Sequence, residues 1–312
     1  MKLVLCGLLL VTAEVASGGL EKYSSFLVAD RNPSAPVPPN AIRVTYLGVN
    51  GLQFETGGHA LLVDPYFTRV GFWPIAFNQA IRSNRERVDE GLNHLRTPVD
   101  AVLMTHAHFD HLLDMPYLLG RTGARFVAGP TAIDLVKSFG PLRGGHAIVN
   151  PGSVRTIEPW AIRVFAAQHD RFFGKIPFNR CPAPGNFKRP VKASDWCVGE
   201  PLSFVIEAGG KRIYIDSGGL AGAPPDSRIG HVDLAILGAA LPDSRARFAE
   251  AVTRLRPRYI FPSHQDDMFG PLSRGFVFGK MTNFPALARE KEKGNLPGRL
   301  ILLDYFQPWT LR

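Results

Sequence analysis

The most constraining feature of the chain is a histidine-rich stretch that directly follows an apolar run. Residues 100–105 are mostly apolar and predict a buried strand. Three histidines and one aspartate follow within six positions, namely His106, His108, Asp110 and His111. We expect them on the turn at the C-terminal end of that strand, where α/β folds place ligand sites, and we expect a helix over residues 112–119.

The spacing of these four residues suits metal binding. His106 and His108 are two positions apart in extended chain, so both rings point to the same side. Asp110 and His111 come after the chain has turned and can face a second point nearby. Neutral imidazole nitrogen and carboxylate oxygen suit zinc, and also manganese, iron or nickel. The alternative is a surface turn that happens to be rich in histidine, which this spacing after an apolar strand disfavours.

The motif resembles the signature of the metallo-β-lactamase-fold hydrolases. In that family three later strands end in a histidine, an aspartate and a histidine. The chain offers His169, Asp216 and His264 in this order, each at the end of an apolar run. The resemblance extends from about residue 41 to the C-terminus.

A smaller signal indicates one branch of the family. The hairpin around Gly57 and Gly58, which leads to Asp64, is similar to the opening of the branch that contains ascorbate-6-phosphate lactonase and N-acylphosphatidylethanolamine phospholipase D. Asp64 either supports a metal ligand or caps a turn. The phospholipase group tends to have a tryptophan after the third histidine, whereas this chain has Asp170.

The resemblance implies an α/β fold, a four-layer αββα sandwich of two mixed β-sheets flanked by helices. It also implies two divalent ions, with Zn²⁺ as the first choice and Mn²⁺ or Fe²⁺ as alternatives. The implied ligands are His106, His108 and His169 for the first ion, Asp110, His111 and His264 for the second, and Asp216 as a bridge. Residues 265–267 are expected to orient His264.

The implied chemistry is hydrolysis by a hydroxide held between two metals, with Asp110 and His111 as catalytic residues. A Gly-x-Ser-x-Gly motif is absent, which argues against a serine hydrolase. Two alternatives come from other classes: an iron-dependent oxidoreductase on the same fold, and a non-catalytic metal-binding protein.

The ends of the chain predict its organisation and location. Residues 1–17 contain Lys2, then an apolar stretch, and end in small residues, a pattern that is typical of a signal peptide. This pattern predicts a periplasmic or secreted protein. The alternative is a buried or amphipathic segment of a cytoplasmic protein. Residues 18–40 form a proline-rich arm, and residues 41–312 form a single domain with an insert over 171–201. Within this domain we expect Thr131 to cap a helix over residues 131–139, and residues 300–305 to form the closing strand.

The insert mixes aromatic and basic side chains directly after His169 and is expected to contact the substrate. Its Arg171 and Lys175 are candidate substrate-binding residues. Cys181 and Cys197 would be the only cysteines left after signal-peptide cleavage, so a disulfide between them is expected. The alternative is a disulfide-pinned loop that only covers the core.

The net charge of +9 favours an anionic partner. Lysine and arginine are scattered along the chain, so no nucleic-acid partner is expected. We expect a small-molecule or lipid-like anionic ester, with a phosphodiester first and a lactone or carboxylic ester as the rival. An aromatic stretch over residues 70–81 leaves contact with a membrane surface as an alternative to packing in the protein rim.

Overall fold

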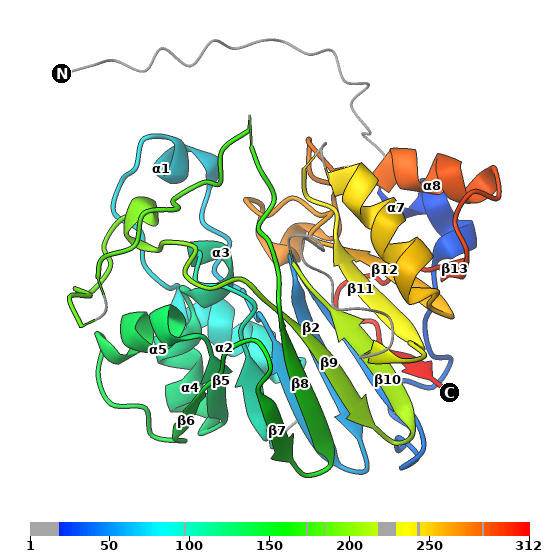
Figure 1. Ribbon diagram of the computed structural model, residues 1–312, viewed down its shortest axis with the longest axis horizontal. Helices are drawn as coiled ribbons and strands as arrows, with labels where there is room; N and C mark the ends of the chain where they lie inside the picture. The colour runs from blue at the N-terminus through cyan, green and yellow to red at the C-terminus, as the bar shows by residue number, and fades with distance from the viewer. Residues whose placement is uncertain are drawn as a thin grey trace.

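The computed structural model has two mixed β-sheets, each of seven strands in the described part of the chain (Figure 1). In the first sheet the order is β14-β1-β2-β3-β4-β5-β6. Its strands are β1 (Ile42–Gly48), β2 (Gly51–Thr56), β3 (His59–Val63), β4 (Ala101–Leu103), β5 (Arg125–Ala128), β6 (His146–Ile148) and β14 (Trp309–Leu311). The strands from β3 to β6 run parallel, and the hairpin of β2 and β3 turns at Gly57 and Gly58 as predicted.

The second sheet has the order β13-β12-β11-β10-β9-β8-β7. Its strands are β7 (Val154–Ile157), β8 (Trp160–Ala166), β9 (Leu202–Ala208), β10 (Lys211–Ile215), β11 (Leu234–Gly238), β12 (Tyr259–Ser263) and β13 (Arg299–Leu300). The strands from β10 to β13 run parallel, and β7 to β10 are antiparallel. Parallel strands place their carboxyl ends at one edge of a sheet. The predicted ligands directly follow the carboxyl ends of strands, so they gather at this edge.

Helices cover the outer faces of both sheets (Figure 1). Beside the first sheet lie α2 (Arg85–Asn93), α4 (Met115–Thr122) and α5 (Pro130–Lys137), and beside the second lie α7 (Ser244–Leu255) and α8 (Phe284–Glu292). The shorter helices are α1 (Phe72–Ala76), α3 (Phe109–Leu112), η1 (Leu20–Phe26), η2 (Ala193–Asp195) and η3 (Leu272–Arg274). This arrangement confirms the predicted αββα sandwich.

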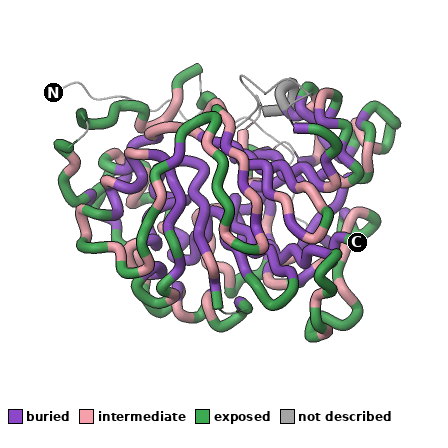
Figure 2. The backbone as a smooth tube through the Cα atoms, turned by 60° about the horizontal axis from the view of Figure 1, so that its bottom comes forward, coloured by how far each residue is buried: buried purple, intermediate pink, exposed green. Residues whose placement is uncertain are grey.

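Successive side chains of a strand point to opposite faces of the sheet, which explains why the sheets are covered on both sides. Ala101 and Leu103 of β4 belong to the core between the sheets, which also contains Phe204 of β9. Val102, between them in sequence, points the other way and packs in a second core with Leu118 of α4. Figure 2 shows that buried residues follow the strands and that exposed residues lie mainly in the surrounding loops.

The structure describes residues 19–96, 98–172, 174–183, 185–217, 229–241, 244–282 and 284–312, with backbone alone over 244–247. The predicted signal peptide, residues 1–17, lies outside these ranges. Within them, no helix has the length and apolar character needed to cross a bilayer.

Three predictions about local structure need correction. The helix expected over residues 112–119 is divided in two: α3 starts earlier, at Phe109, and ends at Leu112, and α4 covers the range from Met115. The start of α3 is set by His108, which is extended and whose carbonyl accepts a hydrogen bond from the Leu112 N–H at 2.8 Å. The predicted strand over residues 300–305 is only β13 and isolated bridges, and β14 forms the sheet edge instead. Thr131 does not cap α5; Gly129 does, because the amide and hydroxyl of Thr131 donate to the Glu200 carboxylate.

The insert is closed on itself by a disulfide and is joined to the rest of the domain by a backbone hydrogen bond. Cys181 and Cys197 form the predicted disulfide, with 5.3 Å between their Cα atoms. The backbone N–H of Ile81 donates to the carbonyl of Val191 at 2.7 Å, which joins the insert to the segment before α2. The tail of the insert therefore packs against the first sheet's outer layer.

Candidate metal centre

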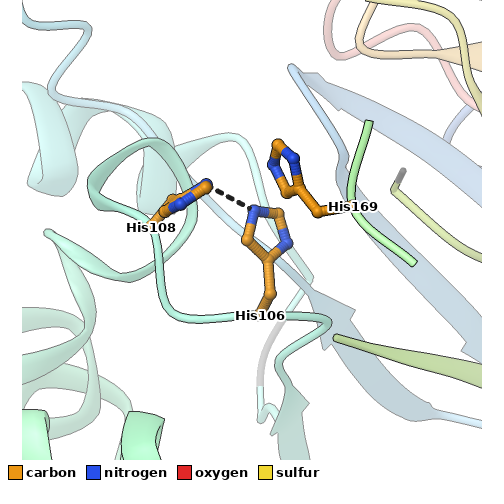
Figure 3. A group of neighbouring side chains, drawn as sticks. All are labelled: His106, His108 and His169. Carbon is orange, nitrogen blue, oxygen red and sulfur yellow. Dashed lines mark hydrogen bonds between the residues drawn. The ribbon is translucent and has the colours of Figure 1, made fainter. Parts of the chain in front are cut away.

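Three histidines from two sheets meet at the carboxyl edge of the sandwich (Figure 3). His106 and His108 follow β4, and His169 follows β8. One ring nitrogen from each lies within 4.8 Å of the others. His106 Nε2 and His108 Nδ1 are 3.1 Å apart, and the His169 ring centroid is 4.8 Å from that of His106. The three nitrogens can therefore converge on one ion.

A second group lies beside the first and consists of Asp110, His111 and His264. The Asp110 Oδ2 atom is 3.1 Å from His264 Nε2 and 3.6 Å from His111 Nε2. The two groups are adjacent, because the ring centroids of His106 and His111 are 4.0 Å apart. Asp110 and His111 lie on the first turn of α3, while His264 follows β12.

His264 has an unusual backbone conformation with φ 54°, a region that non-glycine residues rarely adopt. Its backbone N–H donates to the Val49 carbonyl at 2.6 Å. The Val49 N–H in turn donates to Asp266 Oδ1 at 2.9 Å. The expected influence of residues 265–267 on His264 therefore acts through Asp266 and the backbone of Val49.

In four of the five histidines the ring nitrogen that faces away from the two groups has a polar partner. A metal-binding histidine usually engages its second nitrogen in this way, which fixes the tautomer and the ring orientation. The contacts are His106 Nδ1 with Ser217 Oγ (3.2 Å), His108 Nε2 with the Pro177 carbonyl (3.0 Å), His169 Nδ1 with the Asp170 carbonyl (2.7 Å) and His111 Nδ1 with Asp64 Oδ2 (3.0 Å). Five imidazoles, four of them held in this way, and one carboxylate fit two divalent ions of the zinc type.

Asp64 supports the ligand His111, which is the first of the two roles considered for it. Its carboxylate is fully buried and accepts hydrogen bonds from Asn50 Nδ2 and from the Thr105 backbone N–H, both at 2.8 Å. The Thr105 hydroxyl also donates to it. Asp64 therefore ties the end of β3 to the end of β4 and to the His111 ring.

Burial and neighbouring charge set the protonation of the site. Burial, reinforced by the neighbouring histidines, holds the pKa of His106 well below its usual value. The pKa of His108 falls to about 3, mainly through burial and the nearby His169. Burial alone would raise the pKa of Asp110, but His111 and His264 lower it far below its usual range. Neutral imidazoles and an ionised carboxylate are the forms that bind metal.

Burial would lower the pKa of His111, but the carboxylates of Asp110 and Asp64 raise it above its usual value. The two carboxylates therefore attract positive charge to this ring. A divalent ion placed at the second group would meet the same attraction.

Three predicted site residues fall outside these two groups. Asp216 is fully buried at the end of β10 and accepts a hydrogen bond from the Tyr214 hydroxyl at 3.1 Å, but among the described residues it belongs to neither group. Arg171 and Lys175 are exposed in the insert, between His169 and Pro177. Their roles in bridging the metals and binding the substrate stay predictions.

Two residues that shape the site were not predicted from the sequence. Pro177 of the insert accepts a hydrogen bond from His108, and its position shortly after His169 was the only signal available. Arg69 is fully buried and forms an ion pair with Asp266, with 2.8 Å between nitrogen and oxygen. Nothing in the local sequence distinguishes this arginine from its exposed neighbours.

Comparison with known proteins agrees with the geometry of the site. The family model described as the β-lactamase superfamily domain matches residues 59–264, a range that contains all the predicted ligands. The chain belongs to this family.

Relatives in the family are named as metal-dependent hydrolases. A UPF0173 metal-dependent hydrolase from Shouchella clausii is 28% identical over 173 residues, which cover 55% of this chain and 61% of that protein. One from Pelotomaculum thermopropionicum is 27% identical over 227 residues, covering 72% of this chain and 84% of that protein. The match thus spans less than two thirds of the Shouchella protein.

A solved structure shares the fold. Igni18, a metallo hydrolase from the archaeon Ignicoccus hospitalis, superposes with a TM-score of 0.56 at 18% identity. The superposition covers 87% of this chain and 99% of that chain. At this level of identity the likeness concerns the fold alone.

Proposed function

We propose that this protein is a dinuclear metal-dependent hydrolase that cleaves an ester bond of an anionic substrate, with a phosphodiester as the first candidate. The observation that carries the proposal is the pair of adjacent groups around His106 and His111, in which four of the five histidines have a polar partner at the outward ring nitrogen. The names of the relatives support the hydrolase class.

In this proposal the chain's own residues position the reacting groups. The five histidines and Asp110 would hold two divalent ions, and the buried carboxylate of Asp216 is the proposed further ligand. The bound ions would act as Lewis acids and lower the pKa of water from about 16 toward 7. The His111 ring contacts the Asp64 carboxylate on one side and faces Asp110 on the other, so its orientation depends on the contacts of Asp64.

The substrate class rests on charge and on the insert. The net charge is +9, and Arg171 and Lys175 lie between two residues that are in the site or touch it, His169 and Pro177. Guanidinium and ammonium groups at this rim suit the oxygens of a phosphodiester. A lactone or another carboxylic ester is the rival substrate on the same metals.

A substrate panel separates these alternatives. Bis-p-nitrophenyl phosphate, a phospholipid, a homoserine lactone and a β-lactam are incubated with protein supplied with zinc or with manganese. We expect turnover of the phosphodiester in at least one metal. Turnover of the lactone or the β-lactam alone would overturn the phosphodiester assignment. Elemental analysis of the same samples tests the class, since a protein that takes up only iron and hydrolyses none of the panel favours the oxidoreductase alternative.

Two variants test the insert. Arg171→Ala and Lys175→Ala should each raise the Michaelis constant for the phosphodiester about two- to fivefold, the range expected for an exposed charged contact. Arg155→Ala is the matched control, because Arg155 is an exposed arginine on the edge strand β7. If the Michaelis constant were the same in all three variants, the insert would not be part of the substrate site.

A further inference from the structure

A cavity of about 1110 Å³ lies on the outer side of the first sheet, between the start of α2, helices α4 and α5, and the tail of the insert. None of the six residues of the two metal groups lines it. One wall is the insert segment from Arg189 to Trp196, which the disulfide at Cys197 and the Ile81–Val191 hydrogen bond hold in place. The cavity is thus a feature separate from the metal ligands.

The lining is strongly basic. Arg82, Arg85, Arg87 and Arg189 contribute to it, against one acidic residue, Glu86. Within the described ranges, none of these four arginines forms an ion pair with a carboxylate. Arg69 also lines the cavity, but Asp266 balances its charge. The cavity therefore carries an excess of positive charge that an anion would neutralise.

Two of these arginines lie over aromatic rings of the same cavity. The Arg85 guanidinium is 5.3 Å from the centre of the Tyr117 ring, and the Arg189 guanidinium is 4.6 Å from that of Phe139. Such stacking orients the flat guanidinium group and places apolar surface directly beside it. The lining thus combines charge with surfaces for an aromatic or aliphatic body.

Trp196 extends the apolar lining of the cavity. Its side chain is fully buried, lines the cavity and stacks on Phe139, with ring centroids 5.8 Å apart. Its indole nitrogen has almost no accessible surface, so Trp196 offers a ligand its ring and not its N–H.

We propose that this cavity is a second binding site, independent of the metals, for an organic anion. The ligand carries one carboxylate, sulfonate or phosphate group, which the arginines bind, and an aromatic or aliphatic body, which packs on Tyr117 and Phe139. The positive end of α2, whose first turn begins beside Arg82, adds to the attraction.

The probe is 8-anilinonaphthalene-1-sulfonate, whose sulfonate stays charged at all working pH values and whose rings fluoresce in apolar surroundings. Titration of the full chain should give one saturable site. Arg82→Gln and Arg189→Gln should each weaken binding about tenfold, because each removes a charge-assisted contact. A probe affinity that neither variant changes would overturn the proposal.

Three control variants test where the probe binds. Trp73→Ala removes an exposed tryptophan that does not itself line the cavity although it precedes the lining residue Pro74, with 64% of its surface accessible; loss of probe binding there would assign the dye to that exposed ring and overturn the cavity site. Arg155→Gln should leave the affinity unchanged. Asp110→Asn should abolish hydrolysis and leave probe binding intact, so the cavity proposal and the proposed function can fail separately. Probe binding that Asp110→Asn abolishes would instead make the cavity part of the metal site.

Discussion

The predicted metal ligands come from two regions that are built differently. His106, His108, Asp110 and His111 lie in one stretch after β4, whereas His169, Asp216 and His264 each follow a different strand of the second sheet. The first region can take its shape from local turns. The second requires β8, β10 and β12 to be correctly aligned before its residues approach the first. One region therefore depends on local sequence and the other on sheet topology.

The two regions are also supported differently. In the first, the Asp64 carboxylate contacts the His111 ring directly at 3.0 Å. In the second, Asp266 acts on His264 through the backbone of Val49 and also accepts hydrogen bonds from Arg69 and Tyr46, at 2.8 and 2.9 Å. We expect damage to the first support to weaken metal binding and damage to the second to weaken the fold.

The largest effect is expected for one ligand from each region. His111→Ala and His264→Ala should each reduce hydrolysis more than about 100-fold, because loss of a ligand exceeds the loss of its supporting contact. Circular dichroism should show a folded protein in both, since the two cores do not include the metal ligands. His146→Ala, an exposed histidine at the start of β6, is the control and should keep full activity. Wild-type turnover in either ligand variant would contradict the site.

The next effect is on stability, at Asp266. Asp266→Asn breaks a fully buried ion pair with Arg69 and should lower the free energy of unfolding by about 3–5 kcal/mol. The wild-type Asp266 is ionised, because Arg69 and the Tyr305 hydroxyl lower its pKa against the effect of burial. Urea denaturation measures the difference. Asp267→Asn is the matched control, with its side chain 30% exposed, and a similar loss there would mean that the ion pair contributes little.

Asp64 tests the support of the first region, as Asp266 tests the support of the second. Asp64→Asn should lower metal affinity or activity about 10- to 100-fold, because the amide cannot support the His111 ring as the carboxylate does. Asp100→Asn is the control: Asp100 precedes β4 at its opposite end and accepts hydrogen bonds from the Ala60 N–H and Trp160 Nε1. The Asp100→Asn variant should have a lower free energy of unfolding than the wild type and the same metal affinity. Equal metal affinity in the two variants would remove the proposed distinction between the regions.

The contrast between the regions also explains what the sequence could predict. The strand before His106 and the hairpin at Gly57 and Gly58 depend on neighbouring residues, and both were predicted. The start of α3 at Phe109 was missed, because the preceding His108 has no side-chain hydrogen bond that marks it as a cap. Thr131 was misassigned because its partner, Glu200, is distant in sequence and comes close only in the folded chain.

The remaining site residues could be predicted only through the order of elements in the family. His169, Asp216 and His264 carry no local signal beyond closing a strand, and the structure brings two of them into the metal groups. Arg69 and Pro177 gave no usable signal, because their importance arises from Asp266 and His108, which are far away in sequence. Contacts of this kind require the three-dimensional arrangement of both sheets.

The smallest effect is expected at Asp89, which belongs to neither region and serves as a baseline for both. Its carboxylate accepts hydrogen bonds from the Tyr117 hydroxyl at 2.7 Å and from Arg121 Nε at 2.8 Å, and these contacts lower its pKa below the usual value. A lowered pKa means that the carboxylate stabilises the fold fully above its unfolded pKa of about 3.9, and that this contribution is lost as pH falls through the folded pKa.

Asp89→Asn should therefore lower the urea midpoint only slightly at pH 7, and the difference from wild type should shrink as pH is lowered below about 4. The effect is small because both partners are exposed, with 37% of the Asp89 and 56% of the Arg121 side chain accessible. Added salt should reduce it further by screening the ion pair. A loss as large as that of Asp266→Asn, or one that persists unchanged at low pH, would mean that burial does not separate the two kinds of ion pair in this protein.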